Sequence, residues 1–338
     1  MKKAIIVGER QAELIDVPEP RPKEDWALVK VHATPMCTEY KGWLRGGRRE
    51  YLGHEAVGEV VEVAQPCTVQ PGDRVVVQPQ YPCGTCRLCI AGDYIHCQHS
   101  INFQEFTGGP EGRATYAQYV LKPSWLLSPI PDEVPYERAG LALCGLGPSF
   151  GALEAMEVSA FDTVLITGIG PVGLGGVVNA RFRGARVFVC DTVQWRVERA
   201  MEMGAEAAFE PSDPDVVAKI RERTAGRGVD CALDCSGTVE AERLCLDATR
   251  RKGKVAYVGE CGGDFAVRVS PDLIRTGITI IGSWHYNLNL YPKLMQVIRR
   301  SPVIDLLTSH VLPMTRVNEA FELCASHRTA KVMLKPWK

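Results

Sequence analysis

The pattern of hydrophobic and polar positions changes near residue 146, and the change divides the chain into two parts. Before it, short apolar runs rich in β-branched residues alternate with turn residues, as in residues 27–33 (ALVKVHA) and 56–64 (AVGEVVEVA). Such runs, separated by glycine and proline, predict strands of a mostly antiparallel β domain with irregular loops. A strand predicted at residues 331–335 (KVMLK) would return to this first part.

After residue 146, short apolar strands alternate with helical stretches. Residues 163–168 (TVLITG) and 185–191 (ARVFVCD) have the strand pattern, whereas residues 194–205 (QWRVERAMEMGA) repeat apolar positions at intervals of three and four. This alternation predicts βαβ units around a parallel sheet. The fold class expected for the chain is therefore α/β.

The length and composition of the chain are consistent with two domains. With 338 residues, of which 46% are hydrophobic, the chain can fill two cores of ordinary size. We predict that residues 1–147 and 291–338 form the first domain and that residues 148–290 form the second. The 39 basic and 40 acidic residues give a net charge of −1 and form no long runs. Charge therefore gives no reason to expect a nucleic-acid or membrane partner.

Neither of the two segments that might suggest a membrane or a secretory pathway has the full pattern. The amino terminus has two lysines but only a short apolar run before Glu9, so it lacks the hydrophobic region of a signal peptide. Residues 163–180 carry no charge, but five glycines and a proline interrupt them. These interruptions favour a strand, a turn and a helix over a membrane span. We expect a soluble, cytoplasmic protein.

Residues 168–173 (GIGPVG) form a glycine-rich turn between a predicted strand and a predicted helix. In this GxGxxG pattern the first glycine allows the tight turn and the second lets the backbone approach a pyrophosphate. The third lets the helix pack closely against the strand. The next predicted strand ends in Asp191, 18 residues after the last glycine, where a carboxylate would bind a ribose 2′-hydroxyl and repel a 2′-phosphate.

These observations predict a site for NAD, and Arg196, which lies nearby in the sequence, keeps NADP open as the less favoured cofactor. The alternative is a structural turn in which Asp191 caps a helix. The predicted cofactor-binding residues are Gly168, Gly170, Pro171, Val172, Gly173, Asp191 and Arg196.

The chain has thirteen cysteines and no sign of secretion, so clustered cysteines are more typical of metal ligands than of disulfides. Four of them are separated by two, two and seven residues: Cys83, Cys86, Cys89 and Cys97. Four thiolates can close a tetrahedron around Zn²⁺ with no open position, so such a zinc would be structural. A set of four free thiols is the alternative.

A catalytic zinc, by contrast, needs three protein ligands and one open position. The candidates for these ligands are Cys37, His54 and Cys144, which are scattered along the sequence. Each one alone is more typical of a buried thiol or a core histidine. Their occurrence together with the cysteine cluster and the glycine-rich turn favours a second zinc site.

The chain resembles the zinc-containing medium-chain dehydrogenase/reductases, the family of alcohol, polyol and threonine dehydrogenases. The resemblance covers nearly the whole chain and includes residues 53–63 (GHEAVGEVVEV), the four-cysteine segment, residues 164–174 (VLITGIGPVGL) and residues 317–334 (VNEAFELCASHRTAKVML). It implies a GroES-like catalytic domain and a Rossmann-type cofactor domain with a doubly wound parallel sheet. It also implies a homodimer or a homotetramer.

The resemblance further implies two zinc ions per chain. Cys37, His54 and Cys144 would be the catalytic ligands, and Glu55 would be the carboxylate that supports the catalytic metal. The four clustered cysteines would hold the structural zinc.

The segment after Cys37 departs from the family pattern. Family members usually have a cysteine, one further residue, serine or threonine, and then aspartate, whereas Cys37, Thr38 and Glu39 are consecutive here. By resemblance, the Thr38 hydroxyl would pass the substrate proton outward. No histidine occupies the position of the family's outer proton relay, so Lys41, or the cofactor ribose and water, would take its place.

The resulting hypothesis is the reversible oxidation of an alcohol, with hydride transfer to NAD. Charged residues between positions 39 and 49 are either a solvated loop or the lining of a pocket for a polar substrate. In the second case the substrate is a polyol, sugar, cyclitol or amino alcohol, and Glu39 could pair with a substrate amine. The alternatives are a non-catalytic dinucleotide-binding sensor or structural protein, and a zinc-free quinone reductase. Zinc content would separate these hypotheses.

Overall fold

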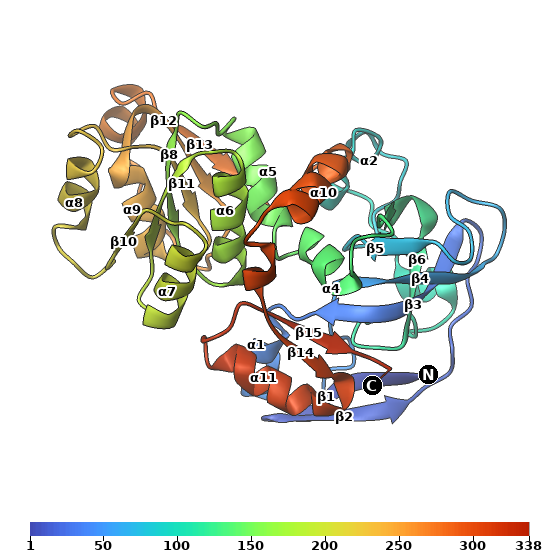
Figure 1. Ribbon diagram of the computed structural model, residues 1–338. Helices are drawn as coiled ribbons and strands as arrows, with labels where there is room; N and C mark the ends of the chain where they lie inside the picture. Colours follow the sequence, from blue (N-terminus) through green and yellow to red (C-terminus); the bar gives the residue numbers. More distant parts are fainter. Residues whose placement is uncertain (338) are drawn as a thin grey trace. The chain divides into compact units, whose positions relative to one another are not determined.

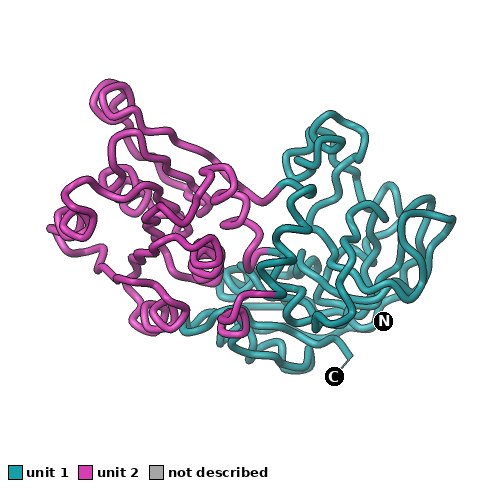
Figure 2. Tube along the Cα trace, turned by 45° about the horizontal axis from the view of Figure 1, so that its top comes forward, with its two compact units in different colours: residues 1–143, 287–299, 308–338 teal, residues 144–286, 300–307 magenta. Residues whose placement is uncertain are grey.

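The computed structural model describes residues 1–337 and divides the chain into two compact units (Figure 2). Unit 1 consists of residues 1–143, 287–299 and 308–338, and unit 2 consists of residues 144–286 and 300–307. Lys338, the last residue of the predicted first domain, lies outside the described residues. Because compactness alone does not define a functional domain, the predicted domain bounds stay a prediction.

Unit 2 is built on a parallel sheet of six strands in the order β10-β9-β8-β11-β12-β13, with helices on both faces (Figure 1). Its elements are α5 (Gly147–Ala155), β8 (Thr163–Thr167), α6 (Pro171–Phe182), β9 (Arg186–Cys190), α7 (Gln194–Glu202), β10 (Ala207–Phe209), α8 (Val216–Glu222), β11 (Val229–Asp234), α9 (Val239–Ala248), β12 (Thr249–Tyr257) and β13 (Thr279–Gly282).

The central strands of this sheet are apolar along their whole length because helices cover both faces. Every residue of β8 is buried, and so is every residue of β9 after Arg186. The sheet order places β9 on one side of β8 and β11 on the other. The strand order therefore runs outward from β8 in both directions, and the point beside β8 where it reverses is the topological switch point. Open α/β sheets bind ligands at this point. The uncharged residues 163–180 form β8, a turn and most of α6, as the sequence predicts.

Unit 1 is built on a seven-stranded sheet in the order β14-β15-β3-β4-β5-β7, with β6 also paired to β3, and on the hairpin β1-β2. Its strands are β1 (Lys2–Gly8), β2 (Gln11–Asp16), β3 (Trp26–Pro35), β4 (Ala56–Val63), β5 (Arg74–Val77), β6 (Tyr119–Pro123), β7 (Leu127–Pro129), β14 (Thr308–Pro313) and β15 (Lys331–Lys335). Its helices are α1 (Glu39–Arg45), α2 (Arg87–Ile90), α3 (Phe103–Thr107), α4 (Tyr136–Ala139), α10 (Tyr291–Arg300) and α11 (Val317–Ala325).

The pairings of this sheet are antiparallel except for β14 with β15. The β-rich unit and the doubly wound parallel unit together confirm the predicted fold class. Among residues 1–337, no helix is both long enough and apolar enough to cross a membrane.

The end of the chain packs against the segment that follows Cys37. Strand β15 pairs antiparallel with β3, with Met333 opposite Pro35, as the sequence predicts for the last strand. Helix α11 packs on α1, where the rings of Trp43 and Phe321 stack with centroids 5.6 Å apart. Both rings are fully buried. This core therefore fixes the backbone on both sides of residue 37.

Candidate functional site

Among residues 1–337, two clusters of possible metal ligands contain the residues that the sequence assigns to two zinc sites. In each cluster the potential ligand atoms all lie within 4.8 Å of one another. The members of the first are Cys83, Cys86, Cys89 and Cys97, and those of the second are Cys37, His54, Glu55 and Cys144. The structure thus brings the predicted ligands together, and their role in binding zinc stays a prediction.

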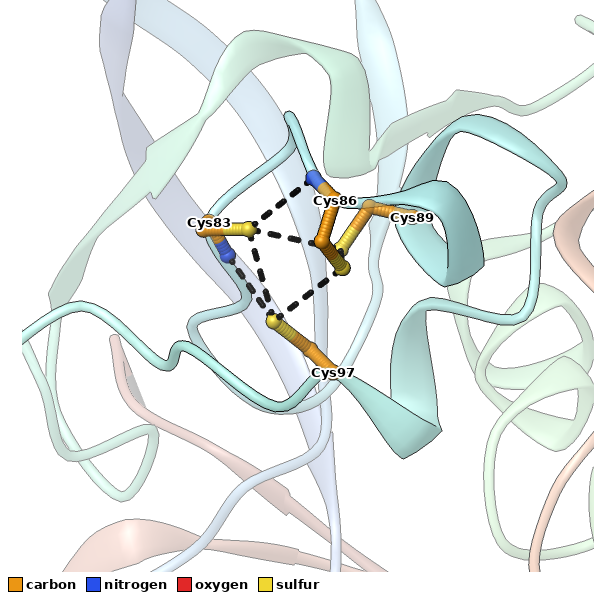
Figure 3. A group of neighbouring side chains, drawn as sticks. All are labelled: Cys83, Cys86, Cys89 and Cys97. Atoms are coloured by element: carbon orange, nitrogen blue, oxygen red, sulfur yellow. Dashed lines mark hydrogen bonds between the residues drawn. The ribbon is translucent and has the colours of Figure 1, made fainter.

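In the first cluster the four sulfurs face one another (Figure 3). The Sγ atoms of Cys86 and Cys89 are 3.5 Å apart, and those of Cys83 and Cys97 are 3.6 Å apart. Backbone amides donate to these sulfurs, among them Cys86 N to Cys83 Sγ and His99 N to Cys97 Sγ, both at 3.3 Å. Amide donors stabilise negative charge on sulfur. Four sulfurs with amide donors suit a closed tetrahedral zinc site.

The second cluster forms where β3 ends and β4 begins. These strands are antiparallel neighbours, with Ala33 opposite Val57. Cys37 follows the end of β3, and His54 directly precedes Glu55 and the start of β4, so strand pairing brings them close together. Cys144 is the first residue of unit 2, but its peptide bond to Leu143 ties it to the last residue of unit 1.

The turn that carries His54 depends on a glycine. Gly53 has φ +81°, a backbone conformation that residues with a side chain rarely adopt. A Cβ at this position would also clash with the Thr115 hydroxyl and the Tyr116 ring. His54 therefore lies in a turn that packs directly against residues 115 and 116.

Glu39 holds the imidazole of His54 in a fixed orientation. Its Oε1 lies 2.9 Å from His54 Nδ1, while its Oε2 accepts hydrogen bonds from the Cys37 amide and the Tyr116 hydroxyl, both at 3.0 Å. Because Nδ1 is engaged by the carboxylate, Nε2 is the imidazole nitrogen left for a metal. A carboxylate partner of this kind is typical of metal-binding histidines.

The pKa shifts agree with this geometry. Although burial raises the pKa of Glu39, hydrogen bonding and the charge of His54 lower it to about 2. Burial lowers the pKa of His54, but hydrogen bonds with Cys37 and Glu39 outweigh this effect and raise it to about 11. Without a metal the pair is therefore an ionised carboxylate beside a protonated imidazole, and a metal would have to displace the proton on Nε2.

These contacts correct the interpretation of Glu39 as a partner for a substrate amine. Only 12% of the Glu39 side chain is exposed, and both of its oxygens bind groups of unit 1. The other charged residues of this segment face solvent: Arg48 pairs with Glu50, and Arg45 donates to the Lys41 carbonyl. The structure favours the alternative of a solvated surface for this segment.

Glu55 is balanced by a buried cation from the end of the chain. Lys331 Nζ donates to Glu55 Oε1 at 2.7 Å and to the Met36 carbonyl at 2.8 Å. The two charged side chains are 0% and 1% exposed. Burial raises the pKa of Glu55 to about 7, and Lys331 opposes that rise. With Glu55 paired in this way, two sulfurs and one nitrogen remain as the donor set, which suits a zinc site with an open position.

The glycine-rich turn connects β8 to α6 at the topological switch point. Gly168 has φ +74°, and a Cβ there would lie 2.5 Å from Ser236 Cα, so the turn needs glycine. Gly170 precedes α6, whose first residue is Pro171. Val172 and Gly173 lie in the first turn of α6, where backbone amides can bind a pyrophosphate.

Asp191 follows the end of β9 and contacts this turn. Its Oδ2 accepts from the Ile169 amide at 2.6 Å, and its Oδ1 accepts from the Val193 amide at 2.8 Å. Arg196 Nη1 lies 3.6 Å from Asp191 Oδ2. The structure therefore brings the predicted cofactor residues together around one turn, with a fixed carboxylate beside it.

Sequence reasoning missed three functional contacts: those of Glu39 with His54, of Lys331 with Glu55, and of Tyr116 with Glu39. The Lys331 contact joins residues 276 positions apart, and the Tyr116 contact joins residues 77 positions apart. No local motif marks either contact. The closeness of Glu39 to Cys37 in the sequence was the one available signal.

Comparisons with known proteins agree with this geometry. Residues 23–132 match the model of the alcohol dehydrogenase GroES-like domain, and residues 171–300 match that of the zinc-binding dehydrogenases. L-Threonine 3-dehydrogenase of Pyrococcus horikoshii is 31% identical over 335 residues, covering 95% of this chain and 94% of the relative. Sorbitol dehydrogenase of Bacillus subtilis is 30% identical over 352 residues, covering 99% and 97%. The solved alcohol dehydrogenase TADH from Thermus sp. ATN1 superposes with a TM-score of 0.88 at 25% identity, covering 99% of each chain.

Replacing Lys331 by methionine should destabilise the protein strongly. The variant Lys331→Met leaves the carboxylate of Glu55 buried without its cation, at an expected cost of about 3–5 kcal/mol in the free energy of unfolding. Urea denaturation followed by tryptophan fluorescence would measure this cost.

The matched control for this prediction is Lys2→Met, which removes the exposed ion pair with Asp16 and should cost at most about 1 kcal/mol. The double variant Lys331→Met/Glu55→Gln should recover part of the lost stability. A cost for Lys331→Met no larger than that of the control would contradict the prediction.

Proposed function

The chain belongs to the zinc-containing medium-chain dehydrogenase/reductase family, and on that premise we propose that it oxidises a polar alcohol with NAD as hydride acceptor. Transfer of a hydride between an alcohol and a nicotinamide cofactor, with the help of zinc, is the reaction of this family. The observation that carries the proposal is the convergence of Cys37, His54 and Cys144 within 4.8 Å.

The donor sets of the two clusters suit two zinc ions with different roles. Zinc at the second cluster would act as a Lewis acid on the substrate oxygen, and the nicotinamide would accept the hydride. Cys37, His54 and Cys144 would hold this ion, with Glu39 orienting the His54 ring. The four sulfurs of the first cluster would hold a structural ion and take no part in the reaction.

Thr38 is the residue we propose for removing the substrate proton. It is exposed, it lies directly after Cys37, and it is the residue before α1. Its side chain makes no capping hydrogen bond to that helix. The hydroxyl can therefore accept a proton from the substrate and pass one to solvent. Glu55, held by Lys331, would support the ligand cluster from its buried side.

The proposed substrate class rests on the relatives. L-Threonine and sorbitol, which two of the relatives' names give as substrates, each have a secondary hydroxyl flanked by further polar groups. We propose a substrate of the same kind: a polyol, sugar, cyclitol or amino alcohol. The charged segment between residues 39 and 49 adds little support, because its exposed side chains pair with one another or with the backbone.

A substrate screen tests the proposed function directly. Purified, zinc-loaded protein should reduce NAD⁺, measured by nicotinamide absorbance, with at least one class among simple alcohols, polyols, sugars, cyclitols and amino alcohols. Absence of turnover across the panel, with NAD still binding, would instead favour the non-catalytic sensor.

Removing one ligand from each cluster should separate the two metal sites. Elemental analysis of the wild type should give about two zinc ions per chain. His54→Ala should lose one of them and all turnover, whereas Cys97→Ser should lose the other and destabilise the four-cysteine segment. The control His310→Ala, in strand β14, should keep both ions and full activity. Turnover by His54→Ala would refute the catalytic assignment.

The preference for NAD over NADP should depend on the charge of Asp191. In Asp191→Asn the side chain keeps its shape but no longer repels a 2′-phosphate, so the ratio of kcat/KM for NADP to that for NAD should rise about tenfold. Glu206→Gln is the matched control, because it removes an exposed carboxylate paired with Arg186, the first residue of β9. An unchanged ratio in Asp191→Asn would show that another group sets cofactor choice.

A second copy of the chain is the partner we propose for β13. Within residues 1–337 this strand ends the six-stranded sheet, so one of its edges offers free backbone hydrogen-bonding groups. The helical segment before it exposes Val269 and Ile274, which are 62% and 72% exposed. Two copies related by a two-fold axis could pair their edges and cover these side chains.

Light scattering should therefore give the mass of a dimer or a tetramer. Ile274→Glu should lower the mass toward that of one chain, whereas the equally exposed control Ile90→Glu should leave it unchanged. A wild type that is monomeric at the concentrations used for the assay would refute this proposal.

We place the protein in the cytoplasm. Among residues 1–337 none of the thirteen cysteines forms a disulfide, and the four-cysteine cluster needs reduced sulfur in order to bind a metal. A reducing compartment would preserve that state.

A further inference from the structure

Tyr116 places a single polar atom against the carboxylate that orients His54. Its side chain is fully buried, and its hydroxyl donates to Glu39 Oε2 at 3.0 Å. The rest of the ring belongs to the apolar core around Phe321, with ring centroids 6.2 Å apart. A phenylalanine would fill the same space, so the hydroxyl is the part of this residue that needs an explanation beyond packing.

We propose that Tyr116 is a positioning residue for the catalytic metal: its hydroxyl, acting through Glu39, fixes the imidazole of His54 with Nε2 toward the other ligands. This inference rests on the proposed function in assuming that the second cluster binds zinc. It assigns to Tyr116 a role in holding the metal, although Tyr116 is not one of the candidate ligands.

The two oxygens of Glu39 have different partners, and this division gives Tyr116 its effect. Oε1 binds His54 Nδ1, whereas Oε2 accepts from the Cys37 amide and from Tyr116. A glutamate side chain has three rotatable bonds, and the Cys37 amide belongs to the same short segment of chain. The donor from residue 116, 77 positions away, anchors the carboxylate to another part of the fold.

Tyr116 can serve as an anchor because its own position is fixed relative to His54. Its backbone amide donates to the Leu52 carbonyl at 3.0 Å, two residues before His54, and its carbonyl accepts from the Ala4 amide at 2.8 Å. Its ring packs directly against Gly53. The hydroxyl therefore has a fixed position relative to the turn that carries the histidine.

The alternative is that the hydroxyl only satisfies its own hydrogen-bonding need in a buried place. In that case its loss would affect overall stability but not the metal. A half-buried tyrosine elsewhere in unit 1 allows the comparison, because Tyr81 Oη donates to the Leu121 carbonyl at 3.2 Å and contacts neither Glu39 nor His54. Tyr81→Phe is thus the matched control for Tyr116→Phe.

The test compares the wild type, Tyr116→Phe, Glu39→Gln, their double variant and Tyr81→Phe as full-length, zinc-loaded proteins. A timed challenge with a chelator measures the loss of each zinc ion. In Tyr116→Phe the ion of the second cluster should leave about tenfold faster than in the wild type. The ion of the four-cysteine cluster should leave at the wild-type rate. Tyr81→Phe should release both ions as the wild type does. When Co²⁺ occupies the second cluster, the visible absorption bands of the protein should shift in Tyr116→Phe but not in Tyr81→Phe.

Because Tyr116 acts through Glu39, its effect should disappear when the carboxylate is replaced. The double variant should therefore lose its metal no faster than Glu39→Gln alone. Wild-type metal loss and an unshifted spectrum in Tyr116→Phe would overturn the proposal. The proposal would also be overturned if the double variant raised the rate of metal loss by the product of the two single-variant effects.

Both readouts work without a substrate, so they separate this inference from the proposed function. If the wild type is inactive but Tyr116→Phe still shows faster metal loss and a shifted Co²⁺ spectrum, only the proposed alcohol oxidation is refuted. A wild type that binds no metal at Cys37, His54 and Cys144 would refute both.

Discussion

A charged side chain removed from water needs a partner, and this requirement determines how the second cluster of candidate ligands is built. Two carboxylates lie beside His54, and neither is exposed enough for water to satisfy it. Glu39 is bound by His54, Tyr116 and a backbone amide, and Glu55 is bound by Lys331. Each pairing fixes one side of the cluster. Removing the cationic partner of either carboxylate, His54 or Lys331, would leave a buried charge without compensation.

The two clusters of candidate metal ligands differ in how they depend on the rest of the fold. The four-cysteine cluster takes all of its ligands from residues 83–97, and its backbone amides come from the same segment and from His99. Its ligand set is therefore local in the sequence. The second cluster needs the pairing of β3 with β4, the turn at Gly53 and the return of β15 to β3. Its formation therefore depends on pairings between segments that are far apart in the sequence.

This difference explains how much could be predicted from the sequence. The cysteine cluster and the turn of β8 into α6 are local, so spacing alone indicated them, and the structure brings their residues together. The apolar strands of unit 2 were recognisable because both faces of their sheet are covered. The meeting of Cys37 with His54 has no local motif, and it was expected from the presence of the other two motifs together with the resemblance. The partners Lys331 and Tyr116 could not be found, because residue type and local pattern do not specify contacts across 276 or 77 positions.

The departure of the sequence after Cys37 has a physical reason in the geometry of α1. Glu39 is the first residue of this helix, and side chains of a helix lean toward its amino terminus. The carboxylate is therefore directed back along the chain, where it meets the Cys37 amide as well as His54. The family pattern has one more residue before its aspartate, whereas here a shorter backbone carries a longer side chain. The longer side chain thus lets the first residue of α1 place a carboxylate oxygen 2.9 Å from Nδ1 of His54.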